Sequence, residues 1–205
     1  MNPVAGNRVT LLRNGAELFP ALVAAIDVAA DDVRIETYIF ADDPAGRAVG
    51  DALKRAAGRG VQVRLLIDGF GSRDLHPAFL EDLRGSGVIV QRFRPERRWF
   101  SFRRSRLRRL HRKIALVDAR VGFVGGINVV DDRSGHDADW PRLDYAVRVE
   151  GPLLGEIYPV VHRLWWLVTA MSRKERQPGF HPPEVHAGPA GDTTASFVYR
   201  DNFGH

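Results

Sequence analysis

Cysteine is absent from this 205-residue chain. Its absence excludes disulfide bonds and thiolate metal sites, and it fits a reducing compartment. Long apolar runs are absent too: no stretch reaches the ~18 apolar residues that a membrane-spanning helix needs. The first eight residues hold no apolar core of signal-peptide length. We therefore expect any contact with a membrane to be made from its surface.

Lysine is scarce, since only Lys54, Lys113 and Lys174 occur among 30 basic residues. The net charge of +5 favours anionic partners such as nucleic acid, acidic lipid or phosphate esters. Arginine is concentrated between Arg92 and Lys113, where Trp and Phe side chains are interleaved with it. This composition fits an anionic membrane surface, and it also fits single-stranded nucleic acid with bases stacked on the rings.

Apolar periodicity predicts alternating strands and helices in the first third of the chain. Strands are expected at 9–13, 33–40 and 61–68, and helices at 16–30 and 44–59. Such alternation is typical of parallel strands whose sheet is covered on both faces. The predicted fold is therefore α/β, an α/β/α sandwich with a mixed, largely parallel sheet and a single repeat.

Three segments are predicted along the chain. Residues 1–172 would form one domain, and residues 173–194, rich in Pro, Gly and His, would form a linker. Residues 195–205 repeat the character of the opening Val9–Asn14, an apolar strand that ends in Arg and Asn. This suggests the first strand of a truncated second repeat, although an accidental similarity in a disordered tail is the alternative.

The most informative stretch runs from His111 to Asn128. It predicts a strand, a tight turn and a second strand that ends at Gly125-Gly126. The side-chain period of a strand places His111 and Lys113 on the same side. An imidazole beside an ammonium suits attack on an anionic group, and glycines without Cβ atoms let a ligand approach the backbone.

This stretch resembles the His-Lys-Asp (HKD) signature of the phospholipase D (PLD) superfamily. The signature positions are filled by His111, Lys113, Asp118, Gly125, Gly126 and Asn128. The resemblance implies that His111, Lys113 and Asp118 belong to the catalytic motif and that Gly125, Gly126 and Asn128 bind the substrate phosphate. Asp118 would be on the opposite strand face from His111, so we expect it to order the turn. No metal or cofactor is needed in this scheme.

His111 could attack phosphorus, giving a phospho-histidine, or could protonate the leaving group. One imidazole cannot do both in one step, so a second HKD domain is expected, either from a homodimer or from a missing C-terminal half. None of the other six histidines is followed two positions later by Lys. Asp144 matches the family position that orients the imidazole, and Glu36 could line the pocket. For both carboxylates, a solvated position at a strand end is the alternative.

Four segments together resemble the first half of bacterial cardiolipin synthases: 35–40, 66–72, 109–113 and 144–152. The resemblance implies transfer of a phosphatidyl group from phosphatidylglycerol to an alcohol. It also implies a cytoplasmic protein that is peripheral at the inner face of the cell membrane. Two alternatives stay open: a homodimeric endonuclease of the same superfamily, which would bind nucleic acid, and a catalytically incomplete half that only binds anionic membranes.

Overall fold

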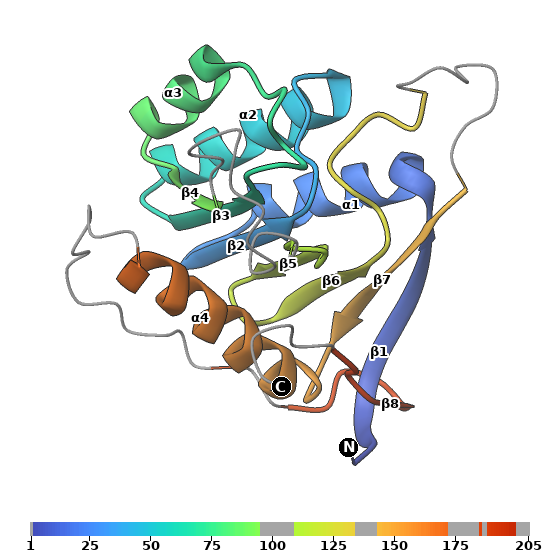
Figure 1. Ribbon diagram of the computed structural model, residues 1–205. Coiled ribbons are helices and arrows are strands. Elements are labelled where there is room, and N and C mark those ends of the chain that lie inside the picture. Colours follow the sequence, from blue (N-terminus) through green and yellow to red (C-terminus); the bar gives the residue numbers. More distant parts are fainter. Residues whose placement is uncertain (1, 95–108, 134–142, 172–184, 186–187, 200–205) are drawn as a thin grey trace.

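A mixed β-sheet forms the middle layer of the molecule (Figure 1). The computed structural model describes residues 2–94, 109–133, 143–171, 185 and 188–199. In chain order the elements are β1 (Val4–Arg13), α1 (Asn14–Asp27), β2 (Asp32–Thr37), α2 (Pro44–Gly58), β3 (Gln62–Asp68), α3 (Pro77–Gly85), β4 (Ile89–Phe93), β5 (Ile114–Val117), β6 (Val121–Gly125), β7 (Tyr145–Glu150), α4 (Leu154–Met171) and β8 (Thr193–Ala195). Helices α1, α2 and α3 cover one face of the sheet, and α4 covers the other. The predicted α/β class and its mixed sheet are confirmed.

The prediction of a largely parallel sheet is wrong. Over the described residues the sheet has eight strands in the order β4-β3-β2-β5-β6-β7-β1-β8. Only β2–β3 and β3–β4 pair in parallel, whereas the other five neighbouring pairs are antiparallel. Strand β1 does not pair with β2 but lies beside β7, with Leu11 opposite Val147. Strand–helix alternation therefore predicts parallel pairing correctly only from β2 to β4, because the hairpin β5–β6 joins the other edge of β2 in the antiparallel sense.

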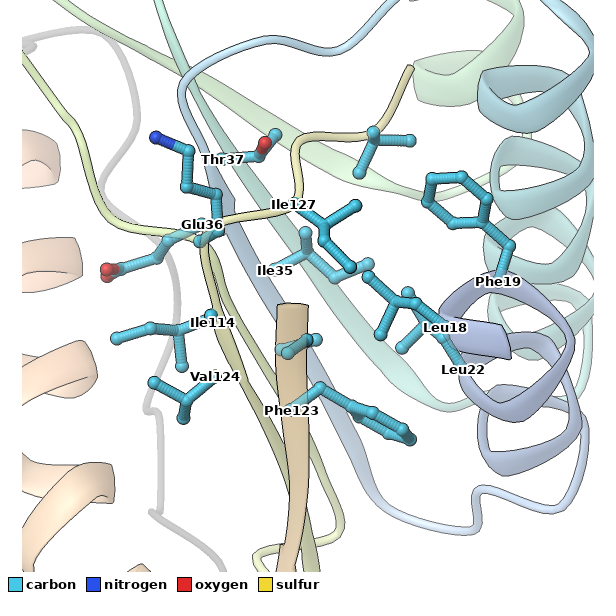
Figure 2. Close-up of a pocket in the computed structure, with 15 residues that line it drawn as sticks. Leu18, Phe19, Leu22, Ile35, Glu36, Thr37, Ile114, Phe123, Val124 and Ile127 are labelled. Atoms are coloured by element: carbon cyan, nitrogen blue, oxygen red, sulfur yellow. The ribbon is translucent and has the colours of Figure 1, made fainter. Parts of the chain in front are cut away.

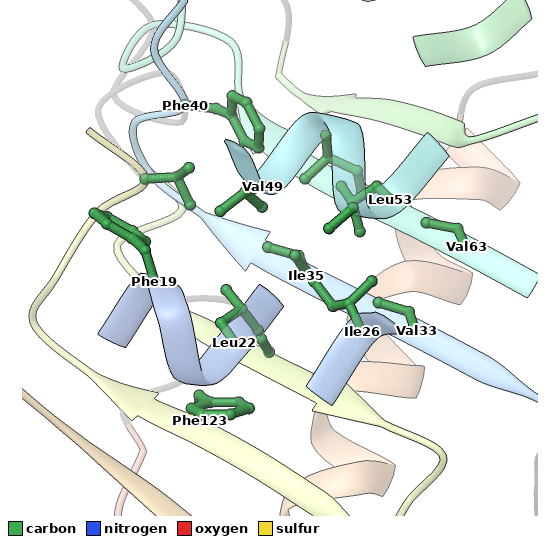
Figure 3. Packing of buried hydrophobic residues seen from close by; sticks show 14 of the residues in the cluster. Phe19, Leu22, Ile26, Val33, Ile35, Phe40, Val49, Leu53, Val63 and Phe123 are labelled. Carbon is green, nitrogen blue, oxygen red and sulfur yellow. The ribbon is translucent and has the colours of Figure 1, made fainter. Parts of the chain in front are cut away.

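Alternate residues of β2 face the two helical layers. Val33 and Ile35 point toward α1 and α2, where they pack with Leu22, Ile26 and Val49 in the larger apolar core (Figure 3).

Helix α2 begins as the sequence predicts. Pro44 occupies its first turn, and the Asp43 carboxylate accepts a hydrogen bond of 2.9 Å from the amide of Gly46.

The opposite face of β2 bears charged side chains that α4 covers. Asp32 receives Arg34 Nε at 2.7 Å and Arg64 Nη1 at 2.6 Å, and the Tyr158 hydroxyl of α4 lies 3.3 Å from the same carboxylate. Asp32, Arg34 and Arg64 are all nearly inaccessible to solvent. Burial lowers the pKa of the Arg64 guanidinium, and Asp32 opposes that effect. An ionic layer therefore holds α4 over the centre of the sheet.

The C-terminal part that the structure describes returns to this domain. Strand β8 pairs with β1, and Phe197 packs in the cluster beneath α4 with Ile157. The strand begins at Thr193, inside the predicted linker, so the boundary at 195 is displaced by two residues. Most of the linker (173–184 and 186–187) and residues 200–205 are outside the described residues. The interpretation of 195–205 as the start of a second repeat stays a prediction.

Within the described ranges, no helix has the length and apolarity that crossing a membrane would require. No group of three His, Asp or Glu side chains in the same ranges is arranged to hold a metal ion.

Candidate active site

His111 and Lys113 lie just before β5, and both contact the ring of Tyr38. The His111 imidazole stacks on that ring with centroids 4.4 Å apart and an interplanar angle of 24°. Lys113 Nζ lies 5.5 Å from the centroid of the same ring and donates a 3.0 Å hydrogen bond to the His111 carbonyl. The two side chains thus lie on the same side, as the strand period predicts. His111 is exposed and Lys113 half-buried, so the pair is open to a ligand.

Arg112 points the other way, beneath α4. Its Nη1 lies 3.4 Å from the Val160 carbonyl of α4 and 3.6 Å from Glu36 Oε2. Residues 111–113 precede β5, but their side chains still alternate: the imidazole and ammonium contact Tyr38, and the intervening guanidinium is directed toward Glu36 and α4. The contacts of Arg112 with Glu36 and α4 fix the side of this segment on which His111 and Lys113 emerge.

Asp68, which we did not predict as a site residue, ties this segment to the neighbouring loop. Its Oδ2 accepts a 2.8 Å hydrogen bond from the amide of Leu110, directly before His111. Its Oδ1 accepts from the amides of Phe70 and Gly71 at 2.9 and 3.0 Å, and the side chain is fully buried. The sequence signal was an acid at the end of an apolar strand, followed by Gly69-Phe70-Gly71.

The ammonium of Lys113 is tuned by two opposing effects. Partial burial lowers its pKa, while the charge of Asp144 raises it. Asp144 was predicted to orient the imidazole, but it makes no hydrogen bond to His111. Its Oδ1 instead accepts a 2.7 Å hydrogen bond from the amide of Tyr145, and its backbone pairs with Asn14. Asp144 therefore acts on Lys113 by charge, and the His111 imidazole contacts the Tyr38 ring instead of the Asp144 carboxylate.

The signature glycines have a packing role that the sequence did not predict. A Cβ at Gly125 would collide with the backbone of Tyr145 and Ala146, and one at Gly126 would collide with the Asp144 carboxylate. Glycine is therefore needed for close packing of β6 on β7, whatever it does for a ligand. Asn128 Oδ1 accepts a 3.0 Å hydrogen bond from the amide of Ile39, which links the signature to the segment after β2.

Asp118 is separated from His111 and Lys113 by the length of β5. Its carboxylate accepts hydrogen bonds from the amides of Ala30, Asp31 and Asp32 at 2.8–2.9 Å. Its φ of 51° belongs to the tight turn between β5 and β6. The expectation that Asp118 orders the turn agrees with these contacts, whereas direct participation in catalysis has no geometric support.

Glu36 lies in the middle of β2 and is only 2% exposed, so it is not a solvated residue at a strand end. Burial raises its pKa to about 8, and Arg112 only partly opposes this. At 3.6 Å, Arg112 is too far for a hydrogen bond, and both carboxyl oxygens are buried without one. At neutral pH Glu36 is therefore mostly a neutral acid beside a guanidinium.

Two cavities adjoin these residues. The smaller, about 30 Å³, is apolar and lies against α1; Figure 2 shows Leu18 and Phe19 beside it and the Glu36 carboxyl pointing away toward α4. A space of that size has room for only about one or two water molecules, which is too little for a phosphate group. The larger pocket measures about 320 Å³ and is open to solvent.

The larger pocket has a cationic part and an apolar part. The cationic lining comes from Arg109, His111, Arg112 and Lys113. The apolar lining comes from Phe93, Leu110, Ile114, Val124, Leu164, Phe197 and Val198. An amphiphile with an anionic headgroup matches this distribution. Most of the predicted arginine-rich segment, residues 95–108, is outside the described residues.

Residues 22–140 match the family model described as cardiolipin synthase, PLD-like domain. The chain belongs to this PLD-like family. It is 37% identical to cardiolipin synthase B of Salmonella typhimurium over 98% of this chain and 48% of that protein. It is 38% identical to cardiolipin synthase A of Pseudomonas putida over 81% of this chain and 34% of that protein. The chain thus spans about half the length of the cardiolipin synthase B relative.

Solved structures show that the PLD-like fold is shared. A PLD family member, NUC from Salmonella typhimurium, superposes with a TM-score of 0.56 at 20% identity, over 78% of this chain and 94% of that one. NucT from Helicobacter pylori superposes with a TM-score of 0.53 at 15% identity, over 82% and 96%. One copy of this fold therefore accounts for nearly the whole of NUC and nearly the whole of NucT.

Proposed function

We propose that this domain transfers a phosphatidyl group, as in cardiolipin synthesis, by way of a covalent intermediate on His111. The observation that supports this best is the pairing of His111 and Lys113 beside a pocket that is cationic at one part and apolar at another. The family supplies the substrate class, since its relatives are named cardiolipin synthases. Phosphatidylglycerol is the proposed donor.

The first step is attack of a His111 ring nitrogen on phosphorus. The P–O bond to glycerol breaks, and the leaving oxygen takes a proton from a second imidazole. Lys113 and the Asn128 amide stabilise the non-bridging oxygens, where negative charge accumulates. The product of this step is a phosphatidyl-histidine, and glycerol is released.

The second step reverses the roles. The hydroxyl of an acceptor alcohol, proposed to be a second phosphatidylglycerol, attacks phosphorus and gives up its proton to the second imidazole. The P–N bond to His111 breaks, and the imidazole is restored. At the end of the cycle the second imidazole has regained its proton and His111 is free again. The scheme uses no metal ion or organic cofactor.

The second imidazole is proposed to come from another HKD domain, either a second copy of this chain or a C-terminal half. Large apolar side chains are exposed next to Asp144, at the edge of the site: Leu143 is 68% exposed, Tyr145 45% and Leu11 on the adjoining β1 61%. A partner domain that covered these side chains would bring its own site close to this one. We further propose that the assembly works at the cytoplasmic face of the cell membrane, on anionic lipid.

The test is incubation of the protein with phosphatidylglycerol vesicles over a range of protein concentrations, with light scattering to follow association. We expect cardiolipin and free glycerol in equal amounts, abolished by His111→Asn. The matched control is His76→Asn, which changes an exposed histidine at the start of α3. Cleavage of DNA without any turnover of lipid would favour the endonuclease alternative. Vesicle binding that His111→Asn preserves, without turnover in the wild type, would favour the membrane-binding alternative.

A further inference from the structure

Tyr38 contacts both reactive side chains of the site, although no signature position includes it. Its ring lies 4.4 Å from the His111 ring and 5.5 Å from Lys113 Nζ. A stacked contact uses the faces of the two rings and leaves the imidazole nitrogens, which are in the ring plane, available to a substrate. The contact with Lys113 places a cation at an aromatic ring, an attractive arrangement.

The backbone that bears Tyr38 is held from two directions. On one side, Ser72 Oγ donates to the Tyr38 carbonyl at 3.1 Å and accepts from the amide of Phe40 at 3.0 Å. On the other side, Ile39 donates to Asn128 Oδ1 at 3.0 Å and accepts from the amide of Val129 at 3.0 Å. The segment is therefore fixed between the loop after β3 and residues 128–129, which follow β6.

Gly71, in the loop after β3, has no space for a side chain because Tyr38 packs against it. A Cβ at Gly71 would collide with the Tyr38 carbonyl and lie 2.8 Å from two carbons of the Tyr38 ring. Ser72 is almost fully buried, so its two hydrogen bonds are shielded from water. A side chain held this firmly can define the orientation of a solvent-exposed neighbour such as the His111 imidazole.

We propose that Tyr38 is a positioning residue: its ring sets the plane of the His111 imidazole and the location of the Lys113 ammonium. Attack on phosphorus places positive charge on the imidazole, and an aromatic face stabilises a cation. The same ring therefore orients the nucleophile and favours the charged form through which it passes. The consequence for catalysis rests on the proposed function, whereas the consequence for geometry does not.

The geometry is tested without turnover, by NMR of protein labelled at histidine and tyrosine. We expect nuclear Overhauser contacts between the Tyr38 and His111 rings in the wild type, and ring protons of His111 shifted upfield by the Tyr38 ring current. Tyr38→Phe should keep the upfield shift and Tyr38→Leu should remove it. Absence of the contacts in the folded wild type would overturn the proposal, so the result does not depend on whether Tyr38→Leu folds.

The catalytic consequence is tested by steady-state turnover of phosphatidylglycerol. We expect a fall of about tenfold in kcat for Tyr38→Leu, with near wild-type kcat in Tyr38→Phe, which keeps the ring. Equal kcat in wild type and a folded Tyr38→Leu would overturn the catalytic part. A wild type that shows the ring contacts but never turns over lipid would instead reject the proposed function and leave the positioning of His111 intact.

Discussion

At the scale of single residues, Glu36 departs strongly from the usual chemistry of its side chain. A carboxyl group in the middle of a buried strand loses its hydration, and Arg112 at 3.6 Å compensates only in part, so the pKa rises to about 8. The unfolded chain releases this proton near pH 4.5, whereas the folded chain keeps it until about pH 8. Between these values the folded state binds more protons than the unfolded state, and stability therefore falls as pH rises.

Glu36→Gln should remove this pH dependence. The free energy of unfolding of the wild type should fall relative to that of the variant by up to about 1.4 kcal/mol per pH unit between the two values, the limit for one proton. Urea unfolding at a series of pH values measures the difference. Glu81→Gln, which changes an exposed carboxylate on α3, should follow the wild-type slope. Parallel curves for Glu36→Gln and wild type would show that Glu36 is ionised in the folded protein.

At the scale of elements, the hairpin β5–β6 separates two kinds of signature residue. His111 and Lys113 precede β5 in the site, whereas Asp118 follows it and accepts hydrogen bonds from three backbone amides at the start of β2, those of residues 30–32. The fixed spacing between Lys113 and Asp118 in the signature thus places these two residues at opposite ends of β5. The signature specifies both a reactive pair and the turn that aligns the hairpin with β2.

Asp118→Ala should accordingly reduce stability and spare the chemistry. Loss of three hydrogen bonds to a charged acceptor should lower the free energy of unfolding by about 2–4 kcal/mol, since the amides are partly exposed and regain water. Turnover per folded molecule should stay within about twofold of wild type because the carboxylate does not reach the site. Asp51→Ala on α2 is the matched control, with an expected loss below about 1 kcal/mol. Unchanged stability with abolished turnover would assign Asp118 to the reaction itself.

The elements also show where sequence reasoning succeeds and where it fails. The Asp43-Pro44 start of α2 and the hairpin after Lys113 follow from local chemistry, which the sequence contains in full. The partner of β1 and the antiparallel place of β5 depend on contacts between distant segments, which local patterns do not encode. Arg34 and Glu36 alternate with apolar residues as on a solvated face, yet α4 covers them. Tyr38 could not be recognised because its role arises only when β2 and β5 are adjacent.

At the scale of the whole molecule, the proposed reaction needs two imidazoles, and among the residues that the structure describes the site presents one, that of His111. The exposed apolar side chains beside Asp144 offer a surface through which a second domain could complete it. In an assembly of two copies, each reaction would use His111 from both chains, one as nucleophile and one as acid.

Mixtures of wild type and His111→Asn test that requirement. If both copies are needed, activity per total protein should follow the square of the wild-type fraction, so that an equal mixture shows about a quarter of full activity. Dimer formation is checked by light scattering on each mixture, and exchange is allowed to reach equilibrium. Activity proportional to the wild-type fraction would mean that one His111 is sufficient for each reaction.

The most direct test of the account is to look for the covalent intermediate. Protein mixed with phosphatidylglycerol vesicles is quenched within one turnover and digested, and the peptide that contains His111 is examined by mass spectrometry. We predict a phosphatidyl group on the His111 ring in wild type, with no adduct on any other histidine and none in Lys113→Ala, where the phosphoryl oxygens lose their cation. Turnover of lipid with His111 unmodified at every quench time would contradict the account.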